Sequence, residues 1–294
     1  MGISFTINVL DLIKRIWDYV KILIDDLEEN PIPASVDPTP SEEEIREKQR
    51  NNLEEQIRIL SSKNKNLHPL AIRDFERMAA NPDVNQELKQ YICDTLCQYL
   101  SKHPDSRPAF NALFKKEHVF VAMEKEIKGA KFIKLKLSSS HTIENVNFLN
   151  CEFHDCHFHN IHFRNFNMHG GVICKCYFKD EIKFSDSFFK DVRIDNSYFR
   201  HAIFSNLAVR EGKMFSSVFL RSELRGVSFI DVEMENITFQ LCNFKMEDFC
   251  RCLMNKVYFE FSHSKQKELD MMMEYFIHTG YHPCVDRSSM TLIV

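Results

Sequence analysis

The C-terminal half of the chain carries a large apolar residue at every fifth position. The series runs from Ile143 to Phe178 in steps of five, skips one residue, and continues from Phe184 to Phe259. In a chain that is 44% apolar, these 24 consecutive positions would arise in a fixed register with odds of roughly 10⁻⁹. A second series, two residues before the first, holds mostly small or β-branched residues.

A period of five fits neither an α-helix, which repeats every 3.6 residues, nor a flat strand, which repeats every two. It requires the backbone to turn a corner every five residues, with two side chains pointing inward and three outward. Four such sides close a square coil, and successive coils stack at the ordinary strand spacing of ~4.8 Å. The pattern therefore predicts a mainly β solenoid over residues 130–262, in which each coil contacts only its neighbours.

Three features flank or interrupt this pattern. The first two sides, beginning at Ala130, are less regular, and an insertion is expected at residues 138–140. Glu247 falls in the inward series, so either the register slips there or its carboxylate reaches a partner, because an unpaired buried charge is costly. Over residues 264–279 the apolar positions recur at helical spacing and predict a helix that caps the last coil.

The chain before the repeat shows helical periodicity. A capping box formed by Ser41 and Glu44 opens a charged helix that reaches about residue 62. Further helices are expected over residues 69–80, 84–102, 107–114 and 118–128. Together they make a small α-helical domain, residues 41–129, that seals the first end of the solenoid. Four prolines within residues 29–40 predict a stiff linker before this domain.

Residues 1–28 predict an amphipathic N-terminal helix. Charged residues interrupt it, so no run of 18 uncharged residues exists to cross a bilayer. Its apolar stripe forms a candidate docking helix, represented by Ile13, Trp17, Val20 and Ile24. We expect this stripe to pack on the same protein or on a second copy. Peripheral membrane contact through residues 3–27 is the alternative, which the mixed charges of the polar face weaken.

The repeat resembles the pentapeptide-repeat family in its Phe-centred variety. The resemblance covers about 130 residues. It extends to Ala71-Ile72 and to the string from Phe75 to Ala79, which are similar to the helical module of many bacterial members, although Phe75 stands where that module has Leu. The resemblance implies a right-handed quadrilateral β-helix, preceded by the small α-helical domain. The spacing of apolar residues, not the resemblance, predicts the C-terminal capping helix and tail in residues 263–294.

Charge and cysteine content narrow the class of protein further. The chain has 38 Lys and Arg against 42 Asp and Glu, a net charge of −4, so it lacks the basic excess of nucleic-acid-binding proteins. No nucleic-acid partner is expected. Ten cysteines occur without a recognisable secretory signal, which favours a reducing compartment. The expected location is cytoplasmic, with membrane association through the N-terminal helix as the alternative.

The sequence contains no recognisable catalytic motif. Only 7 glycines are present, and no phosphate-binding loop, G-x-S-x-G or H-E-x-x-H can be drawn. Cysteines and histidines between Cys151 and His162 have the residue types of a zinc site. The five-residue period, however, points the cysteines inward and the histidines outward, on opposite sides of one wall. We therefore expect no catalytic residue, no metal and no cofactor.

One outward face of the solenoid has the composition of a protein interface. Because one coil has about twenty residues, positions about twenty apart lie on the same face. On this face they are aromatic and aliphatic residues interleaved with arginine. The candidate interaction face consists of Tyr177, Tyr198, Arg200, Val218, Leu220, Arg221, Leu241, Tyr258 and Phe261. The N-terminal helix of the chain, a second copy or another protein would cover it.

These observations favour a non-enzymatic protein–protein interaction scaffold that presents a rigid β-helix surface, and that self-associates or joins a larger complex. The resemblance implies an alternative, because some relatives inhibit DNA gyrase by imitating the charge and shape of DNA. Residues 143–262 hold 16 Asp and Glu against 14 Lys and Arg, a net charge of −2. This is far from a ladder of phosphates, so the DNA-mimic reading ranks second.

Overall fold

The computed structural model describes residues 42–139, 141–224, 226–245, 248–262, 265–281, 283–286 and 290–294. The chain divides into two compact units, residues 1–48 and 49–294. Several predictions lie outside the described residues and stay predictions: the linker 29–40, the position of Glu247, and the docking helix with Ile13, Trp17, Val20 and Ile24.

In the described part of the chain, four helices precede the repeats: α2 (Glu42–Ser61), α3 (His68–Ala80), α4 (Gln86–Lys102) and α5 (Arg107–Phe114). The Asn85 side chain caps α4 by accepting the backbone N–H of Leu88 at 2.8 Å. Helix α5 contacts both α3 and α4, and α3 and α4 each bury an apolar face. A small helical core therefore forms directly before the solenoid.

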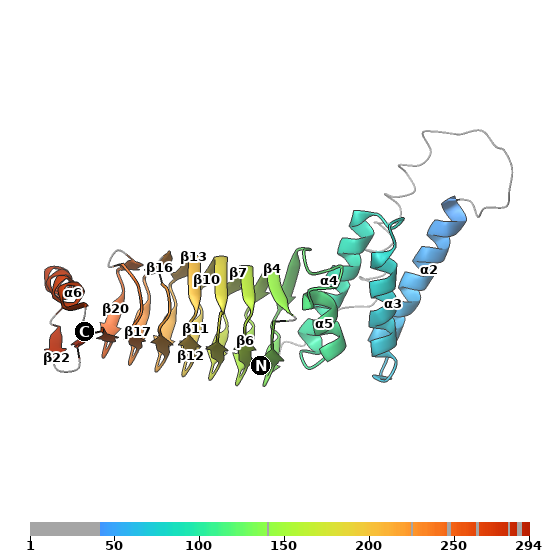
Figure 1. Ribbon diagram of the computed structural model, residues 1–294. Coiled ribbons are helices and arrows are strands. Elements are labelled where there is room, and N and C mark those ends of the chain that lie inside the picture. Colours follow the sequence, from blue (N-terminus) through green and yellow to red (C-terminus); the bar gives the residue numbers. More distant parts are fainter. Residues whose placement is uncertain are drawn as a thin grey trace. The chain divides into compact units, whose positions relative to one another are not determined.

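The solenoid predicted from the five-residue period is confirmed (Figure 1). Its strands form three parallel sheets, apart from two antiparallel strands at the C-terminal end. The first sheet contains β1 (Lys125–Lys128), β4 (Thr142–Leu149), β7 (His162–His169), β10 (Lys183–Lys190), β13 (Ile203–Arg210), β16 (Val227–Ile230) and β19 (Phe249–Cys250). The second contains β2 (Lys131–Ile133), β5 (Glu152–His154), β8 (Val172–Cys174), β11 (Arg193–Asp195), β14 (Lys213–Phe215), β17 (Glu233–Glu235) and β20 (Leu253–Asn255).

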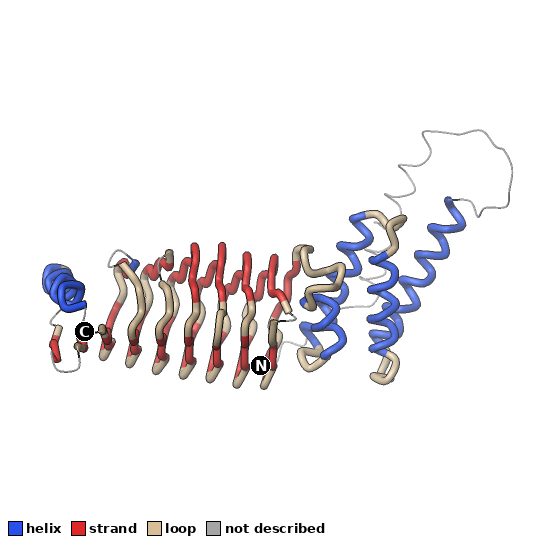
Figure 2. Tube along the Cα trace, viewed as in Figure 1, coloured by secondary structure: helices blue, strands red, loops and turns tan. Residues whose placement is uncertain are grey.

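The third sheet has nine strands. In spatial order they are β22 (Cys284–Asp286), β23 (Thr291–Ile293), β21 (Tyr258–Glu260), β18 (Thr238–Gln240), β15 (Val218–Leu220), β12 (Tyr198–Arg200), β9 (Tyr177–Lys179), β6 (His157–His159) and β3 (Lys136–Leu137). Figure 2 shows that strands of the first sheet run on through a bend, whereas those of the other sheets are short. The first sheet thus supplies two sides of each coil, and the other two sheets supply one side each.

Most described corners of the coil are made by one residue in the left-handed backbone region. At Asn165, which bends the eight-residue strand β7, φ is 46°, and at Asn206, which bends β13, φ is 56°. Asn and Asp tolerate this conformation better than other residues with a Cβ, which explains why they occupy many corners. Gly171, with φ of +94°, could not be replaced, since an added Cβ would lie 2.0 Å from the carbonyl oxygen of Cys151.

The interior is filled by stacked phenylalanine rings. The ring centroids of Phe178 and Phe199 lie 4.5 Å apart with an interplanar angle of 5°, and those of Phe199 and Phe219 lie 4.6 Å apart with an angle of 4°. All three side chains are buried. Because every coil repeats the same backbone geometry, equivalent side chains superpose from coil to coil and bury their faces against each other.

The extra residue predicted between Phe178 and Phe184 is located at a corner. Asp180 and Glu181 both adopt positive φ, at 54° and 53°, where most described corners have one such residue. The strand register shifts accordingly, because Lys183 of β10 pairs with His162, a separation of 21 residues, whereas it pairs with Ile203 at a separation of 20. A whole extra residue is accommodated in the bend and leaves the inward series undisturbed.

The helix predicted over residues 118–128 is wrong. The segment forms turns that lead into β1, so the first coil begins at Lys125, before the expected start at Ala130. Lys125 is buried, and its Nζ donates to the carbonyl oxygens of Val121 (2.7 Å), Met123 (2.6 Å) and Glu144 (3.0 Å). These three acceptors replace water around the ammonium group, while burial lowers the pKa of Lys125.

A helix and a hairpin close the C-terminal end. Helix α6 (Gln266–His278) places Phe276 5.6 Å from Phe259 of the last coil, measured between ring centroids. Strand β23 then pairs antiparallel with β21, and β22 pairs antiparallel with β23. The predicted C-terminal helix is therefore confirmed, and the reversal of strand direction ends the parallel stacking.

Among the described residues, the helices are too short or too polar to cross a membrane.

Candidate interaction face

The outward side chains of the nine-stranded sheet form the face that the sequence singled out, and we call it the tyrosine face. In each coil it presents one residue before and one after the buried phenylalanine. Strand pairing places Tyr177, Tyr198, Val218 and Tyr258 in one column, with Thr238 between the last two. The second column contains His159, Lys179, Arg200, Leu220, Gln240 and Glu260.

Arg221 and Leu241 lie beside these columns rather than within them. Both are corner residues with positive φ, at 50° and 53°, and both are exposed. Arg221 follows the strand that ends at Leu220, and Leu241 follows the strand that ends at Gln240, so both lie at the rim of the tyrosine face. Eight of the nine predicted residues therefore lie on or beside one sheet face, although their role in binding stays a prediction.

The ninth residue, Phe261, was assigned wrongly, since its side chain is only 6% exposed. Its backbone N–H donates to the carbonyl oxygen of Met290 at 2.9 Å, and its ring centroid lies 6.1 Å from that of Phe244. The C-terminal segment that forms β23 passes over this corner. The five-residue period predicts an outward position here, but it contains no information about the segment that folds back.

Several residues of the tyrosine face were missed by the sequence analysis. The ring of His157 stacks on Tyr177 with centroids 4.9 Å apart and an interplanar angle of 14°, and Lys179 Nζ lies 5.3 Å from the centroid of Tyr177. His159 Nε2 lies 3.3 Å from Asp180 Oδ2. All of these residues occupy outward positions of the same period, so counting by twenty would have found them. They are polar, whereas the predicted face consists mainly of aromatic and aliphatic residues with arginine.

The cysteine and histidine residues are separated as the period predicted. Cys151 and Cys156 are buried, whereas His157, His159 and His162 are exposed. Burial raises the pKa of Cys151 to about 11 and that of Cys242 to about 12, which keeps both thiols protonated. Within the part of the chain that the structure describes, no three His, Cys, Asp or Glu side chains are placed to hold a metal ion together.

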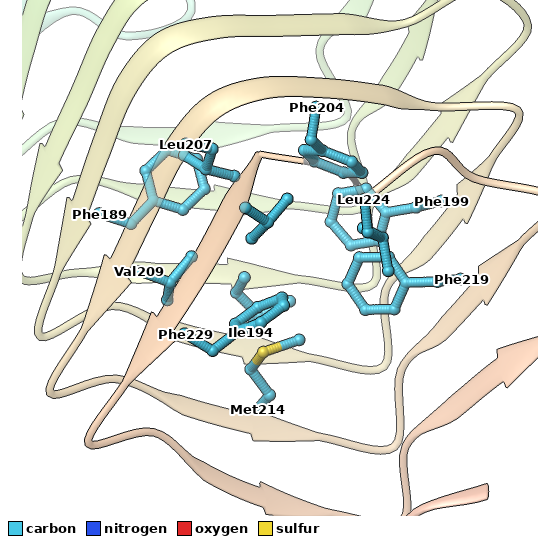
Figure 3. Close-up of a pocket in the computed structure, with 11 residues that line it drawn as sticks. Phe189, Ile194, Phe199, Phe204, Leu207, Val209, Met214, Phe219, Leu224 and Phe229 are labelled. Atoms are coloured by element: carbon cyan, nitrogen blue, oxygen red, sulfur yellow. The ribbon is translucent and has the colours of Figure 1, made fainter. Parts of the chain in front are cut away.

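The hollows between the described coils are small. Two hollows of about 10 Å³ each lie between the stacked rings, which is about the volume needed for one water centre. Figure 3 shows one of them, lined by side chains such as Phe204, Leu207 and Met214. Their linings are entirely apolar, so a water would find no hydrogen-bond partner. Small-molecule sites commonly need at least about 300 Å³, so both hollows are too small for such a ligand.

Three solved structures are similar to parts of the chain. A trypsin-treated form of QnrB1, a plasmid-mediated fluoroquinolone resistance protein, is 19% identical, with 39% of this chain and 57% of that chain covered and a TM-score of 0.32. Rfr23, a pentapeptide repeat protein from the cyanobacterium Cyanothece 51142, is 7% identical, with 38% and 89% covered and a TM-score of 0.34. HetL from Nostoc sp. strain PCC 7120, involved in heterocyst differentiation regulation, is 6% identical, with 47% and 90% covered and a TM-score of 0.12.

Neither a family model nor a curated protein matches the chain.

Proposed function

From its five-residue repeat and four-sided coil the chain has the pentapeptide-repeat fold, and on this premise we propose that it is a non-enzymatic scaffold that binds protein through the tyrosine face. The rigid stack of coils holds outward side chains at set spacings. The helical domain seals one end of the stack, and α6 with the terminal hairpin seals the other. A binding surface of this kind loses little conformational entropy when a partner docks.

The observation that carries the proposal is the composition of the tyrosine face. Tyr177 is 40% exposed and lies beside the cationic Lys179, and Leu241 is 38% exposed. Tyrosine and arginine are enriched at protein interfaces, because they combine a large apolar surface with hydrogen-bonding groups. The second sheet carries ion pairs between neighbouring coils, as in Lys213–Glu233 at 2.7 Å and Lys131–Glu152 at 2.8 Å.

The DNA-mimic alternative finds less support. A phosphate-like surface needs a continuous run of acidic side chains, whereas residues 143–262 carry a net charge of −2. Acidic residues outside the tyrosine face are partly neutralised, as Asp231 is by Arg251 across the gap between two coils. A gyrase supercoiling assay tests this reading directly, and inhibition at micromolar protein would reverse the ranking.

Affinity capture from the source cells tests the scaffold proposal. Full-length chain is compared with Tyr198→Asp on the tyrosine face and with Phe215→Asp as a matched control. Phe215 is also a half-buried aromatic residue at an outward position, but it belongs to the second sheet. Tyr198→Asp is expected to lose the bound protein and Phe215→Asp to keep it, with circular dichroism showing that both variants fold. Equal retention by both variants would contradict the proposal.

The candidate docking helix remains a separate prediction. Its apolar stripe, with Ile13, Trp17, Val20 and Ile24, is proposed to add a second contact, either to protein or to a membrane surface. Vesicle flotation of wild type and Trp17→Asp separates these two readings. Flotation of the wild type that Trp17→Asp abolishes would favour the membrane.

A further inference from the structure

The charges of the tyrosine face are distributed unevenly along the sheet. Strand β15 is the fifth of nine strands, and its outward residues, Val218 and Leu220, are apolar. On the helical-domain side of β15, the outward strand positions of β3, β6, β9 and β12 include three cations, Lys136, Lys179 and Arg200, and no acid. The corner after β9 adds one acid, Asp180, which lies 3.3 Å from His159. On the C-terminal side, the described outward positions of β18, β21, β23 and β22 include Glu260 and Asp286 and no cation.

This arrangement is self-complementary under a two-fold rotation. A two-fold axis that runs along β15, in the plane of contact, would turn a second copy so that the two solenoids run in opposite directions. Each column of outward residues would then face the same column of the other copy. Each strand then opposes the strand at the same distance on the other side of β15. Lys179 would oppose Glu260, and Tyr177 would oppose Tyr258, while Val218 and Leu220 would oppose their own counterparts.

We propose that a second copy of this chain binds the tyrosine face in this antiparallel arrangement, with the two-fold axis at β15. The inference rests on the proposed function and names the occupant of the same face. Opposite charges meet two strands to either side of the axis, where Lys179 opposes Glu260, and apolar side chains meet at the centre, as in interfaces with a dry core and a polar rim. A parallel arrangement would instead place Lys179 and Arg200 near the same residues of the other copy.

The size of the face sets the strength of the expected contact. Nine strands spaced by ~4.8 Å extend over ~38 Å, and three outward residues per side give a width of ~10 Å. The flat area of ~400 Å² per copy is about half of the area that each partner buries in a standard interface. We therefore expect a reversible dimer that forms at micromolar or higher concentration rather than an obligate one.

A charge-swap experiment tests the pairing. In one chain, Lys179 and Glu260 are four strands apart, about 19 Å, so they cannot pair with each other within a copy. Sedimentation velocity between 1 and 200 µM is expected to show ~10-fold weaker dimerisation for Lys179→Glu and for Glu260→Lys. The double variant is expected to return to within ~3-fold of wild type. Lys190→Glu, at the equivalent position of the first sheet, serves as the control and is expected to leave dimerisation unchanged.

Cysteine cross-linking gives a second, independent readout. Leu220→Cys, in a chain whose accessible Cys174, Cys250 and Cys284 are replaced by Ser, places a thiol at the two-fold axis. A self-cross-link at Leu220→Cys, and none at Phe215→Cys in the same background, supports the arrangement. The inference is overturned if wild type remains monomeric at 200 µM, or if the double charge swap stays as weak as the single variants. A monomer that still captures another protein through Tyr198 would leave the proposed function standing.

Discussion

The backbone N–H of Ser197 donates a hydrogen bond to the Oγ of Ser217 in the next coil, with an N···O distance of 3.1 Å. The Oγ of Ser217 in turn donates to the carbonyl oxygen of Phe215 at 2.8 Å. Both serines are buried in the inward small-residue series. In the backbone ladder, the carbonyl of Ser197 accepts a hydrogen bond, but its N–H donates none. The hydroxyl of Ser217 accepts from this N–H, which an apolar side chain at the same position could not do.

We predict that Ser217→Ala lowers the free energy of unfolding by about 1–2 kcal/mol, because it removes two hydrogen bonds and leaves the N–H of Ser197 buried without an acceptor. Chemical denaturation measures the change. Ser205→Ala, at an exposed outward position, is the control and should change stability by less than about 0.5 kcal/mol. Equal effects of the two substitutions would show that the buried hydroxyl contributes nothing specific.

A second prediction concerns the corners. Asn196 has a φ of 48°, and a β-branched residue is strained in this region of the Ramachandran plot. Asn196→Val should therefore destabilise the protein by about 1–2 kcal/mol. The same substitution at Asn255, an exposed position within strand β20, should be neutral or slightly stabilising. A neutral result at both positions would argue against left-handed corners.

Position along the stack should decide the cost of removing an interior ring. Phe199 is 2% exposed and stacks between two other rings, so Phe199→Ala should lower the free energy of unfolding by about 3–5 kcal/mol. Phe244, near the C-terminal end, is only half-buried, so Phe244→Ala should lower the free energy of unfolding by less than Phe199→Ala does. Hydrogen exchange would show whether Phe199→Ala also opens the coils on both sides of it, as expected for a solenoid whose coils contact only their neighbours. Similar losses at both positions would contradict this view.

The junction between the helical domain and the first coil should weaken in acid. Burial lowers the pKa of His141, and the nearby Arg107 and Lys115 lower it further. His141 Nε2 lies 3.3 Å from the Oδ1 of Asn111 on α5. Between the lowered pKa and the ordinary histidine value of about 6.5, the unfolded state binds more protons than the folded state, so stability falls as the pH falls through this window.

The substitution His141→Asn removes this titration. The variant is expected to lose stability less steeply than wild type between pH 6.5 and 5, whatever its stability at pH 7.5. His103 and His162 also have lowered pKa values, again chiefly through burial, so part of the slope should remain. Thermal denaturation across this pH range provides the measurement, and an unchanged slope would count against a role for His141.

Much of the interior could be predicted from the sequence alone. Phe178, Phe199 and Phe219 were assigned to the interior by their spacing, and all three are buried. The extra residue after Phe178 was also visible, because it shifts the series by one position. The five-residue period depends only on neighbouring residues. Whether a side chain points inward or outward can therefore be predicted without knowing which distant segments it meets.

The two ends of the solenoid were harder to predict. Ile127 lies five residues before Phe132 and belongs to the inward series, yet residues 118–128 were predicted to be a helix. Lys125 occupies an inward position where the repeat has small or β-branched residues, and only its three carbonyl acceptors explain why it is tolerated there. These acceptors come from a turn and from the next coil, which sequence spacing does not bring together.

The sequence by itself therefore determined the repeating coil, its inward rings and the column of tyrosines on one face, because the five-residue period is a property of neighbouring residues. Only the tertiary structure decided that Phe261 is covered, that the coil begins at Lys125 and that the last strands reverse direction. It also placed β15 at the centre of nine strands. Each of these features depends on contacts between segments far apart in the chain, and no local period encodes which distant segments will meet.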